Sequence, residues 1–178
     1  SLTLRGGYSP ATWVFNPGAN PTIIDGQNLY RGAELFSNIP NIRVAMSNIT
    51  IQNGRALAPA FDPGAFGGGI SVDGPAVTLT NMSFLNNQAI GANVGSADGG
   101  SAAGSALSIR STNGTGVSIL SGVTFSGNSS TGGTGATRGG YAFGAMFAFA
   151  AVVHIENAQF TSNTAQGGSS SGIGLSAG

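Results

Sequence analysis

A single phrase recurs along this chain and constrains its fold more than any other feature. An alternating apolar segment leads into a large apolar anchor, which is followed by two residues that are mostly small or polar and then by Asn or Gly. The anchors, which we expect to stack as a structural ladder, are Ile51, Phe84, Phe125 and Phe160, at intervals of 33, 41 and 35 residues. Repeats of about 20–50 residues are typical of solenoids, and connections between parallel strands of one sheet are right-handed in nearly all cases. The sequence therefore predicts an all-β chain folded as a right-handed parallel β-helix.

The alternation within each phrase changes parity midway, which requires a bend before the anchor. Successive side chains of a strand point to opposite faces, so Leu79 and Phe84 can both point inward only if the chain turns between them. The residues at this bend are Asn48, Asn81, Gly122 and Asn157. Asn and Gly accept a left-handed backbone conformation most readily, so this column predicts a turn with positive φ.

A second column of Asn and Gly follows the anchors. It comprises Gly54, Asn87, Asn128 and Asn163. Two interpretations fit it: a second turn with positive φ, or a ladder of stacked amides like those of cross-β structures. Because Gly interrupts the column, we expect the turn.

Small residues also lead into a further apolar strand in each repeat. These strand starts are Gly67-Gly68-Gly69-Ile70, Gly104-Ser105-Ala106-Leu107, Gly144-Ala145-Met146-Phe147 and Gly172-Ile173-Gly174-Leu175. The chain has 31 Gly, 7% charged and 40% hydrophobic residues, which fits tight turns around a narrow core, because disordered segments lack regular apolar positions. We expect a single β-helix over residues 1–178, with opening coils at 1–43 and repeats at 44–175. A chain of 178 residues with anchors 33–41 residues apart should form about five coils.

Two insertions interrupt the repeats at turns, over residues 59–66 and 90–103. Solenoids tolerate insertions on faces that remain free, and binding surfaces often lie there. Each insertion is therefore either a binding loop or an inert surface loop, and we favour the second slightly.

The strand starts and the Phe–Asn phrases resemble the GGAI, GGAL and FxxN repeats of the polymorphic outer membrane protein family, over residues 44–175. The first motif is kept loosely, as in Gly104-Ser105-Ala106-Leu107. Residues 4–28, with the turn Thr22-Ile23-Ile24-Asp25-Gly26, are similar to the opening coils of secreted β-helix proteins. The resemblance implies a secreted or surface-exposed β-helix used for adhesion or as a structural stalk.

Charged residues are too sparse and scattered to predict catalysis. The acids are Asp25, Glu34, Asp62, Asp73, Asp98 and Glu156, and the bases are Arg5, Arg31, Arg43, Arg55, Arg110 and Arg138, with no Lys. Polysaccharide lyases need carboxylates that hold calcium together with a base, and glycoside hydrolases need paired carboxylates. We therefore expect no catalytic residue and no cofactor. Single, dispersed Arg residues also predict no nucleic-acid partner.

Metal binding is likewise not predicted. His154 is the only histidine, and the chain has no Cys, whereas zinc sites need several such ligands. Strand alternation places His154 on the outer face. Asp62 and Asp98 lie in the two insertions, but a lone carboxylate makes a weak calcium site.

Residues 141–155 are the most apolar segment, but they are too few for a membrane-spanning helix, which takes about 20 apolar residues. The segment contains Gly144 and His154 and aligns with strands of the other repeats, so we expect core strands and no transmembrane segment. Its outward positions include Ala and Phe, which predicts an apolar stripe where another subunit packs.

Four Asn residues are followed two positions later by Ser or Thr, as N-glycosylation requires. These candidate sites are Asn48, Asn81, Asn113 and Asn128. Asn113 lies in a Ser-Thr-Asn-Gly-Thr-Gly turn and is the strongest candidate. Sugar there would fit an extracellular wall or appendage component.

Low charge, many turns, the lack of Cys and the family resemblance favour an extracellular or cell-surface location. The first residues already look like a strand, so we expect the chain to begin after a cleaved leader or within a longer polypeptide. Exposed strand edges recruit further strands, and solenoids need caps. We therefore expect coil ends to associate with other copies or other surface proteins, with glycans as further partners.

The sequence thus favours a non-catalytic structural or adhesive β-helix in a cell-surface stalk, filament or matrix. The alternative is a carbohydrate-binding or polysaccharide-cleaving β-helix, which would gather acids, Arg and aromatic residues on one outer face. In that case Asp73, Arg110 and His154 would converge. An ice or mineral binder would need a regular array of Thr, which the outward positions lack.

Overall fold

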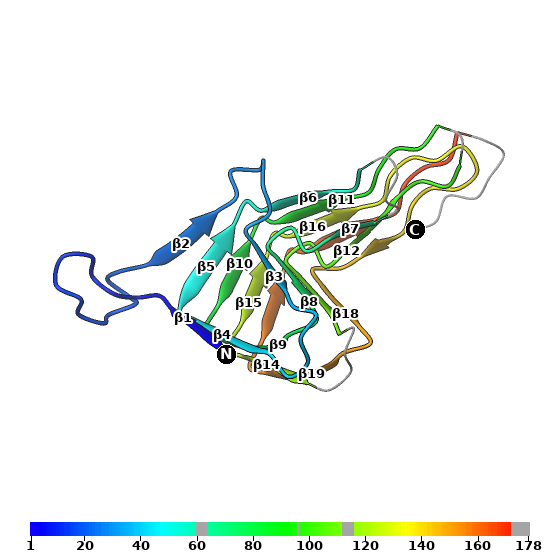
Figure 1. The fold of residues 1–178 in the computed structure, drawn as a ribbon. Coiled ribbons are helices and arrows are strands. Elements are labelled where there is room, and N and C mark those ends of the chain that lie inside the picture. The colour runs from blue at the N-terminus through cyan, green and yellow to red at the C-terminus, as the bar shows by residue number, and fades with distance from the viewer. Residues whose placement is uncertain (60–63, 96, 112–115, 172–178) are drawn as a thin grey trace.

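The structure is a computed structural model that describes residues 1–59, 64–95, 97–111 and 116–171. Over those residues the protein is an all-β parallel β-helix, with five parallel sheets and no helix (Figure 1). The chain visits the sheets in a fixed order, so each sheet receives one strand from each full turn. Hydrogen bonds between turns, instead of hairpins, therefore hold the fold together.

The five sheets are numbered here in the order in which one turn passes through them. The first contains β1 (Leu2–Arg5), β4 (Arg43–Ser47), β9 (Ala76–Thr80), β14 (Val117–Ser121) and β19 (Val152–Glu156). The second contains β2 (Thr22–Asp25), β5 (Ile49–Gln52), β10 (Ser83–Leu85), β15 (Thr124–Ser126) and β20 (Gln159–Thr161). The third contains β6 (Arg55–Leu57), β11 (Gln88–Ile90), β16 (Ser129–Thr131) and β21 (Thr164–Gln166). The fourth contains β7 (Gly64–Phe66), β12 (Ser101–Ala103) and β17 (Ala142–Phe143), and the fifth contains β3 (Ala33–Phe36), β8 (Ile70–Asp73), β13 (Leu107–Arg110) and β18 (Met146–Phe149).

The described residues make about three full turns, fewer than the five coils expected from the sequence. The complete turns are β4 to β8, β9 to β13 and β14 to β18. The opening residues supply only β1, β2 and β3, because part of that segment forms a projecting loop closed by an antiparallel bridge between Tyr8 and Phe15 (Figure 1, dark blue). The last described turn ends with β21, and the strand start at residues 172–175 lies outside the described residues.

Strand register follows the repeat that the sequence predicts. Val44 pairs with Val77, and Met46 with Leu79, across β4 and β9. The anchor ladder runs through the second sheet, where Phe84 pairs with Ile51 on one side and with Phe125 on the other, and Phe125 pairs with Phe160. Ile51, Phe84 and Phe125 form one continuous apolar core with Ile70, Leu107 and Ile109 from the fifth sheet. Phe160, at the last described turn, lies outside this buried core.

The bend before the anchor has the backbone conformation that its residues favour. The φ angles are +56° at Asn48, +50° at Asn81, +64° at Gly122 and +52° at Asn157. This left-handed residue reverses the alternation between the first and second sheets. Inward residues on both sides of the bend therefore reach the same core.

The second Asn column is an amide ladder, and the turn expected from the sequence is wrong there. Positive φ occurs one residue earlier, at Asn53, Asn86, Gly127 and Ser162. Asn87 and Asn128 are fully buried, and Asn128 Oδ1 accepts hydrogen bonds from both the backbone N and Nδ2 of Asn87, each at 2.9 Å. Asn163 Oδ1 accepts the same pair from Asn128, at 3.0 and 2.9 Å. The amides thus satisfy buried backbone groups.

Gly54 belongs to this column for a steric reason. A Cβ there would overlap the carbonyl oxygen of Gly68, and it would lie 2.7 Å from Asn87 Oδ1. The Gly54 backbone N donates to that same oxygen at 2.8 Å. Gly54 therefore forms the end of the ladder, where neighbouring backbone occupies the space of a side chain.

The insertion at residues 90–103 is part of an ordered projection, which we call the glycine arm (residues 91–95, 97–100, 132–140 and 167–171). Figure 1 shows these loops running side by side away from the sheets. Val94 pairs with Gly135, which pairs with Ser170. The backbone N of Gly133 donates to Gly100 O, and that of Gly140 donates to Gly133 O, both at 2.8 Å. Interlocking backbone bonds, with few side chains, hold the arm.

We expect Gly133→Val to disrupt the arm, because a Cβ at this position would overlap the carbonyl oxygen of Ala92. Such overpacking costs about 1–3 kcal/mol. Amide hydrogen exchange should accelerate across residues 91–95 and 132–140, while the sheets keep their protection. Gly95→Ala is the matched control, since a Cβ at Gly95 meets nothing within 4 Å. Equal exchange in the two variants would contradict tight backbone packing in the arm.

Candidate ligand-binding site

Most charged side chains are held in separate local contacts. Among the described residues, no group of three or more His, Cys, Asp or Glu side chains could hold a metal ion. Arg31 pairs with Glu34 at 3.2 Å, and His154 Nε2 lies 3.1 Å from Glu156. Asp98 is exposed in the arm, whereas Asp62 lies outside the described residues. These groups do not form a shared acid–base site.

Asp25 is a structural acceptor at the edge of the first described turn. Its carboxylate accepts hydrogen bonds from Gln52 Nε2, Asn53 Nδ2 and the backbone N of Gln27. The side-chain bond from Gln52 contributes most to holding its pKa below the usual range, followed by the Gln27 and Asn53 bonds. The bonds from Gln52 and Asn53 link the end of β2 to β5 and the residue after it.

Two charged residues that a glycan-binding groove would gather do come together. Asp73 and Arg110 pair in register across β8 and β13, and Arg110 Nη2 lies 3.1 Å from Asp73 Oδ2. His154 does not join them, because it lies on β19 in the first sheet and contacts Glu156. Of the three residues that the carbohydrate-binding alternative would bring together, Asp73 and Arg110 are therefore adjacent, and His154 lies elsewhere.

Aromatic rings collect beside this ion pair. In β18, Met146 and Ala148 pair with core residues of β13, so alternation turns Phe147 and Phe149 outward. Their ring planes are within 5° of parallel, with centroids 6.4 Å apart. This pair is the outward apolar stripe expected from the apolar segment 141–155.

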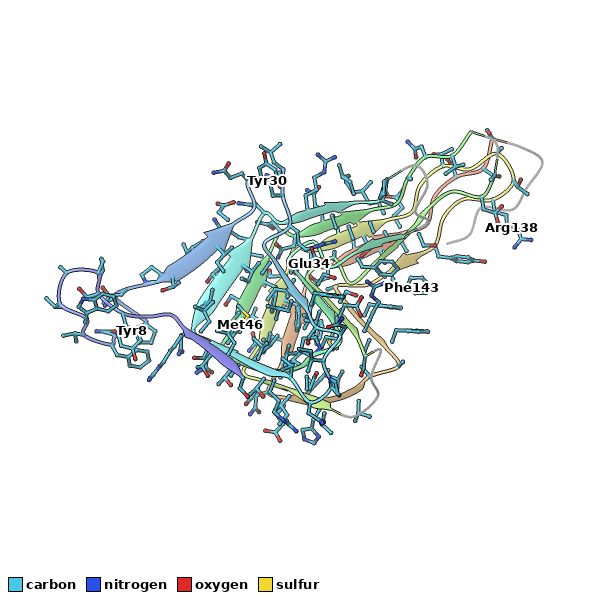
Figure 2. The ribbon with its side chains drawn as sticks, in the orientation of Figure 1. Tyr8, Tyr30, Glu34, Met46, Arg138 and Phe143 are labelled. Atoms are coloured by element: carbon cyan, nitrogen blue, oxygen red, sulfur yellow. The ribbon has the colours of Figure 1, made fainter. Side chains whose placement is uncertain are left out.

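Two rings from the fourth sheet complete the cluster. Phe66 of β7 and Phe143 of β17 lie 6.0 and 5.6 Å from Phe147, measured between ring centroids. Figure 2 shows the labelled Phe143 near the place where the arm leaves the rest of the fold. We call the set Phe66, Asp73, Arg110, Phe143, Phe147 and Phe149 the aromatic corner.

Two arginines hold this corner in shape. The Arg110 guanidinium carbon lies 4.8 Å from the centre of the Phe66 ring, a cation–π contact that orients both groups. Arg31 donates from Nε to Gly67 O and from Nη2 to Phe66 O, both at 2.9 Å. The backbone beneath the Phe66 ring is thereby fixed to the first described turn.

A hollow of about 400 Å³ opens at the edge of the aromatic corner, which is within the size range of small-molecule sites. It is lined by Asp73, Arg110, Ser111, Phe149 and Ala150. Asp73 Oδ1 and Arg110 Nε are buried without a hydrogen-bond partner in the part of the chain that the structure describes. Ala150 has φ of +51°, a conformation that non-glycine residues hold at some cost and that clusters at functional sites.

The glycosylation candidates occupy different environments. Asn128 is fully buried, and its side-chain amide belongs to the ladder, so it cannot carry sugar in the folded chain. Asn48 is half-buried and Asn81 is exposed, both at the positive-φ bend. Asn113 lies outside the described residues. Of these candidates, the structure therefore excludes Asn128.

The apolar segment 141–155 forms β17, β18 and the start of β19. Over the described ranges, no helix is long and apolar enough to cross a membrane.

Searches of protein-family models, of curated proteins and of solved structures found no match.

Proposed function

We propose that this chain is a non-catalytic structural or adhesive β-helix that works outside the cell or at its surface, in a stalk, filament or matrix. The observation that carries the proposal is the aromatic corner, where exposed rings are held on a scaffold of stacked turns. Phe143 is 44% exposed and Phe149 is 62% exposed, although burial of such rings is normally favourable. A contiguous apolar surface of this kind is typical of an interaction site.

The lining of the hollow favours binding over cleavage. Asp73 is the one carboxylate among the described residues that line it, whereas glycoside hydrolysis ordinarily uses two carboxyl groups. Arg110 also holds that carboxylate in an ion pair. The resemblance of the repeats to those of polymorphic outer membrane proteins supports the same adhesive or structural role.

Self-association through the outer turns is part of this proposal. Ile155 and Phe160 continue inward-facing columns, since they pair with Leu120 and Phe125, yet they are 44% and 51% exposed in the described structure. A further layer of strands would cover them. A second copy, another surface protein or more of the same polypeptide could supply that layer.

We expect rods joined into filaments or larger surface assemblies when native material is viewed by electron microscopy without crosslinking. In sedimentation velocity, Ile155→Lys should reduce association of the purified chain, because it places a charge on the apolar edge. Ile119→Lys is the control, since Ile119 pairs with His154 on the outward side of the same sheet. Circular dichroism would establish that both variants fold. Dispersed rods in native material, with association equal in both variants, would refute the structural role.

A further inference from the structure

From the geometry of the aromatic corner, we infer that it binds a neutral carbohydrate, with a pyranose ring packed on Phe149 and adjacent hydroxyls bonded to Asp73 and Arg110. The inference rests on the proposed adhesive function and names the ligand class of that site. It draws on four properties of the corner: an exposed aromatic ring beside a hollow, a pair of partly exposed polar side chains, balanced charge and rigidity.

The first property is an exposed aromatic ring beside a hollow. The planes of Phe147 and Phe149 are within 5° of parallel, and Phe149 lines the hollow with 62% of its surface exposed. One face of a pyranose ring carries mainly C–H groups, so it can pack against an aromatic face and remove apolar area from water. Sites that combine apolar walls with a few polar groups are typical of small-molecule recognition.

The second property is a pair of polar side chains at the wall of the hollow, which Asp73 and Arg110 both line. The Asp73 side chain is 24% exposed and the Arg110 side chain is 36% exposed. Asp73 Oδ1 and Arg110 Nε are themselves buried, so a ligand would meet the other polar atoms of the carboxylate and the guanidinium. Two neighbouring sugar hydroxyls match this acceptor and donor pair, since each hydroxyl can both donate and accept. One hydroxyl would donate to the carboxylate, and the other would accept from the guanidinium.

The third property is charge balance. Arg110 and Asp73 neutralise each other at 3.1 Å, and the nearby Arg31 is paired with Glu34 at 3.2 Å. The corner therefore offers little net charge to attract an anion. This favours a neutral sugar over a uronate polymer or a phosphate.

The fourth property is rigidity before binding. Arg110 stacks over Phe66, and Arg31 holds the Phe66 and Gly67 carbonyls. A site already fixed in shape loses less conformational entropy when it binds. The left-handed Ala150 beside Phe149 is consistent with a backbone held in place for a local purpose.

The test is calorimetric titration of the whole chain with three neutral hexasaccharides (cellohexaose, maltohexaose and mannohexaose) and with the acidic hexagalacturonate. We expect at least one neutral sugar to bind, and to bind more tightly than hexagalacturonate. Phe149→Ala should weaken that binding about tenfold or more, as truncation of a central aromatic contact commonly does. Phe149→Trp should retain it.

Ile23→Ala is the matched control, because Ile23 is a 51% exposed apolar residue on β2, outside the aromatic corner. Failure of all three neutral sugars to bind would overturn the inference, as would equal losses in Phe149→Ala and Ile23→Ala. Tighter binding of hexagalacturonate would also overturn it. If Phe149→Ala instead abolished self-association of the chain without any sugar effect, the corner would be a protein interface.

These outcomes separate the inference from the proposed function. Association through the Ile155 edge, without sugar binding, would leave the structural role intact and remove only the ligand class. Dispersed rods that bind a neutral hexasaccharide would instead leave the corner as a glycan site and remove the filament.

Discussion

Phe125→Ala is expected to lower the free energy of unfolding by about 3–5 kcal/mol, the usual cost of deleting a buried Phe side chain. Phe125 is fully buried, and its ring centroid lies 5.1 Å from that of Phe84 and 4.6 Å from that of Phe160. Its removal takes a ring from the middle of the ladder and leaves a cavity between two turns. Urea unfolding followed by circular dichroism would measure the loss.

Phe160→Ala is the natural comparison for this prediction. It removes the same side chain from the same column, but Phe160 is 51% exposed in the described structure. Less apolar area returns to water, so we expect a loss of less than about half that of Phe125→Ala. Equal losses for the two variants would show that the last described turn is covered in solution.

Asn128→Gly is expected to cost roughly 3 kcal/mol or more, because several buried partners lose their hydrogen bonds at once and each costs about 1–3 kcal/mol. Asn128 Oδ1 accepts from Asn87 N and Nδ2, and Asn128 Nδ2 donates to Phe84 O at 3.0 Å and to Asn163 Oδ1 at 2.9 Å. Thermal and urea unfolding would both record the loss.

Asn81→Gly is the matched variant, because Asn81 belongs to the column of residues at the positive-φ bend before the anchor. Asn81 has φ of +50° and is exposed, so Gly can take the same backbone conformation and we expect a change within about 1 kcal/mol. The same substitution thus distinguishes a turn from a ladder. If the two variants were equally stable, the side-chain amides of the ladder would contribute nothing measurable.

The stacking of turns could be predicted from the sequence because it depends on local periodicity. Leu79 and Phe84 belong to columns of matching apolar residues, and such columns mark the inward positions. In the structure Leu79 pairs with Met46 and Phe84 pairs with Ile51, as the repeat predicts. The role of the second Asn column could not be decided in the same way, since exchange of Asn with Gly suits either a turn or a ladder. Gly54 favoured the turn interpretation in the sequence, but glycine is required there by a tertiary contact. The Gly68 carbonyl occupies the space that a side chain at position 54 would need.

Only part of the aromatic corner could be predicted from the sequence. Asp73 and Arg110 each end the strand that follows a small-residue start, so their pairing could have been inferred from the alignment. Phe66 and Phe143 belong to the fourth sheet, and their approach to Phe147 depends on how that sheet meets the fifth. The relative orientation of the fourth and fifth sheets is not encoded in any periodic pattern of the sequence. The number of turns was overestimated because the loop closed by Tyr8 and Phe15 takes up residues without adding strands to the solenoid.

The amide ladder also gives the solenoid a direction. Each Asn donates from Nδ2 to the Oδ1 of the Asn in the following turn, from Asn87 to Asn128 and from Asn128 to Asn163, and all strands within the five sheets run parallel. The two ends are therefore chemically different, and a layer that continues the ladder must carry the same polarity. Two copies joined through this ladder would meet head to tail, as in a heterologous interface that can repeat without closing.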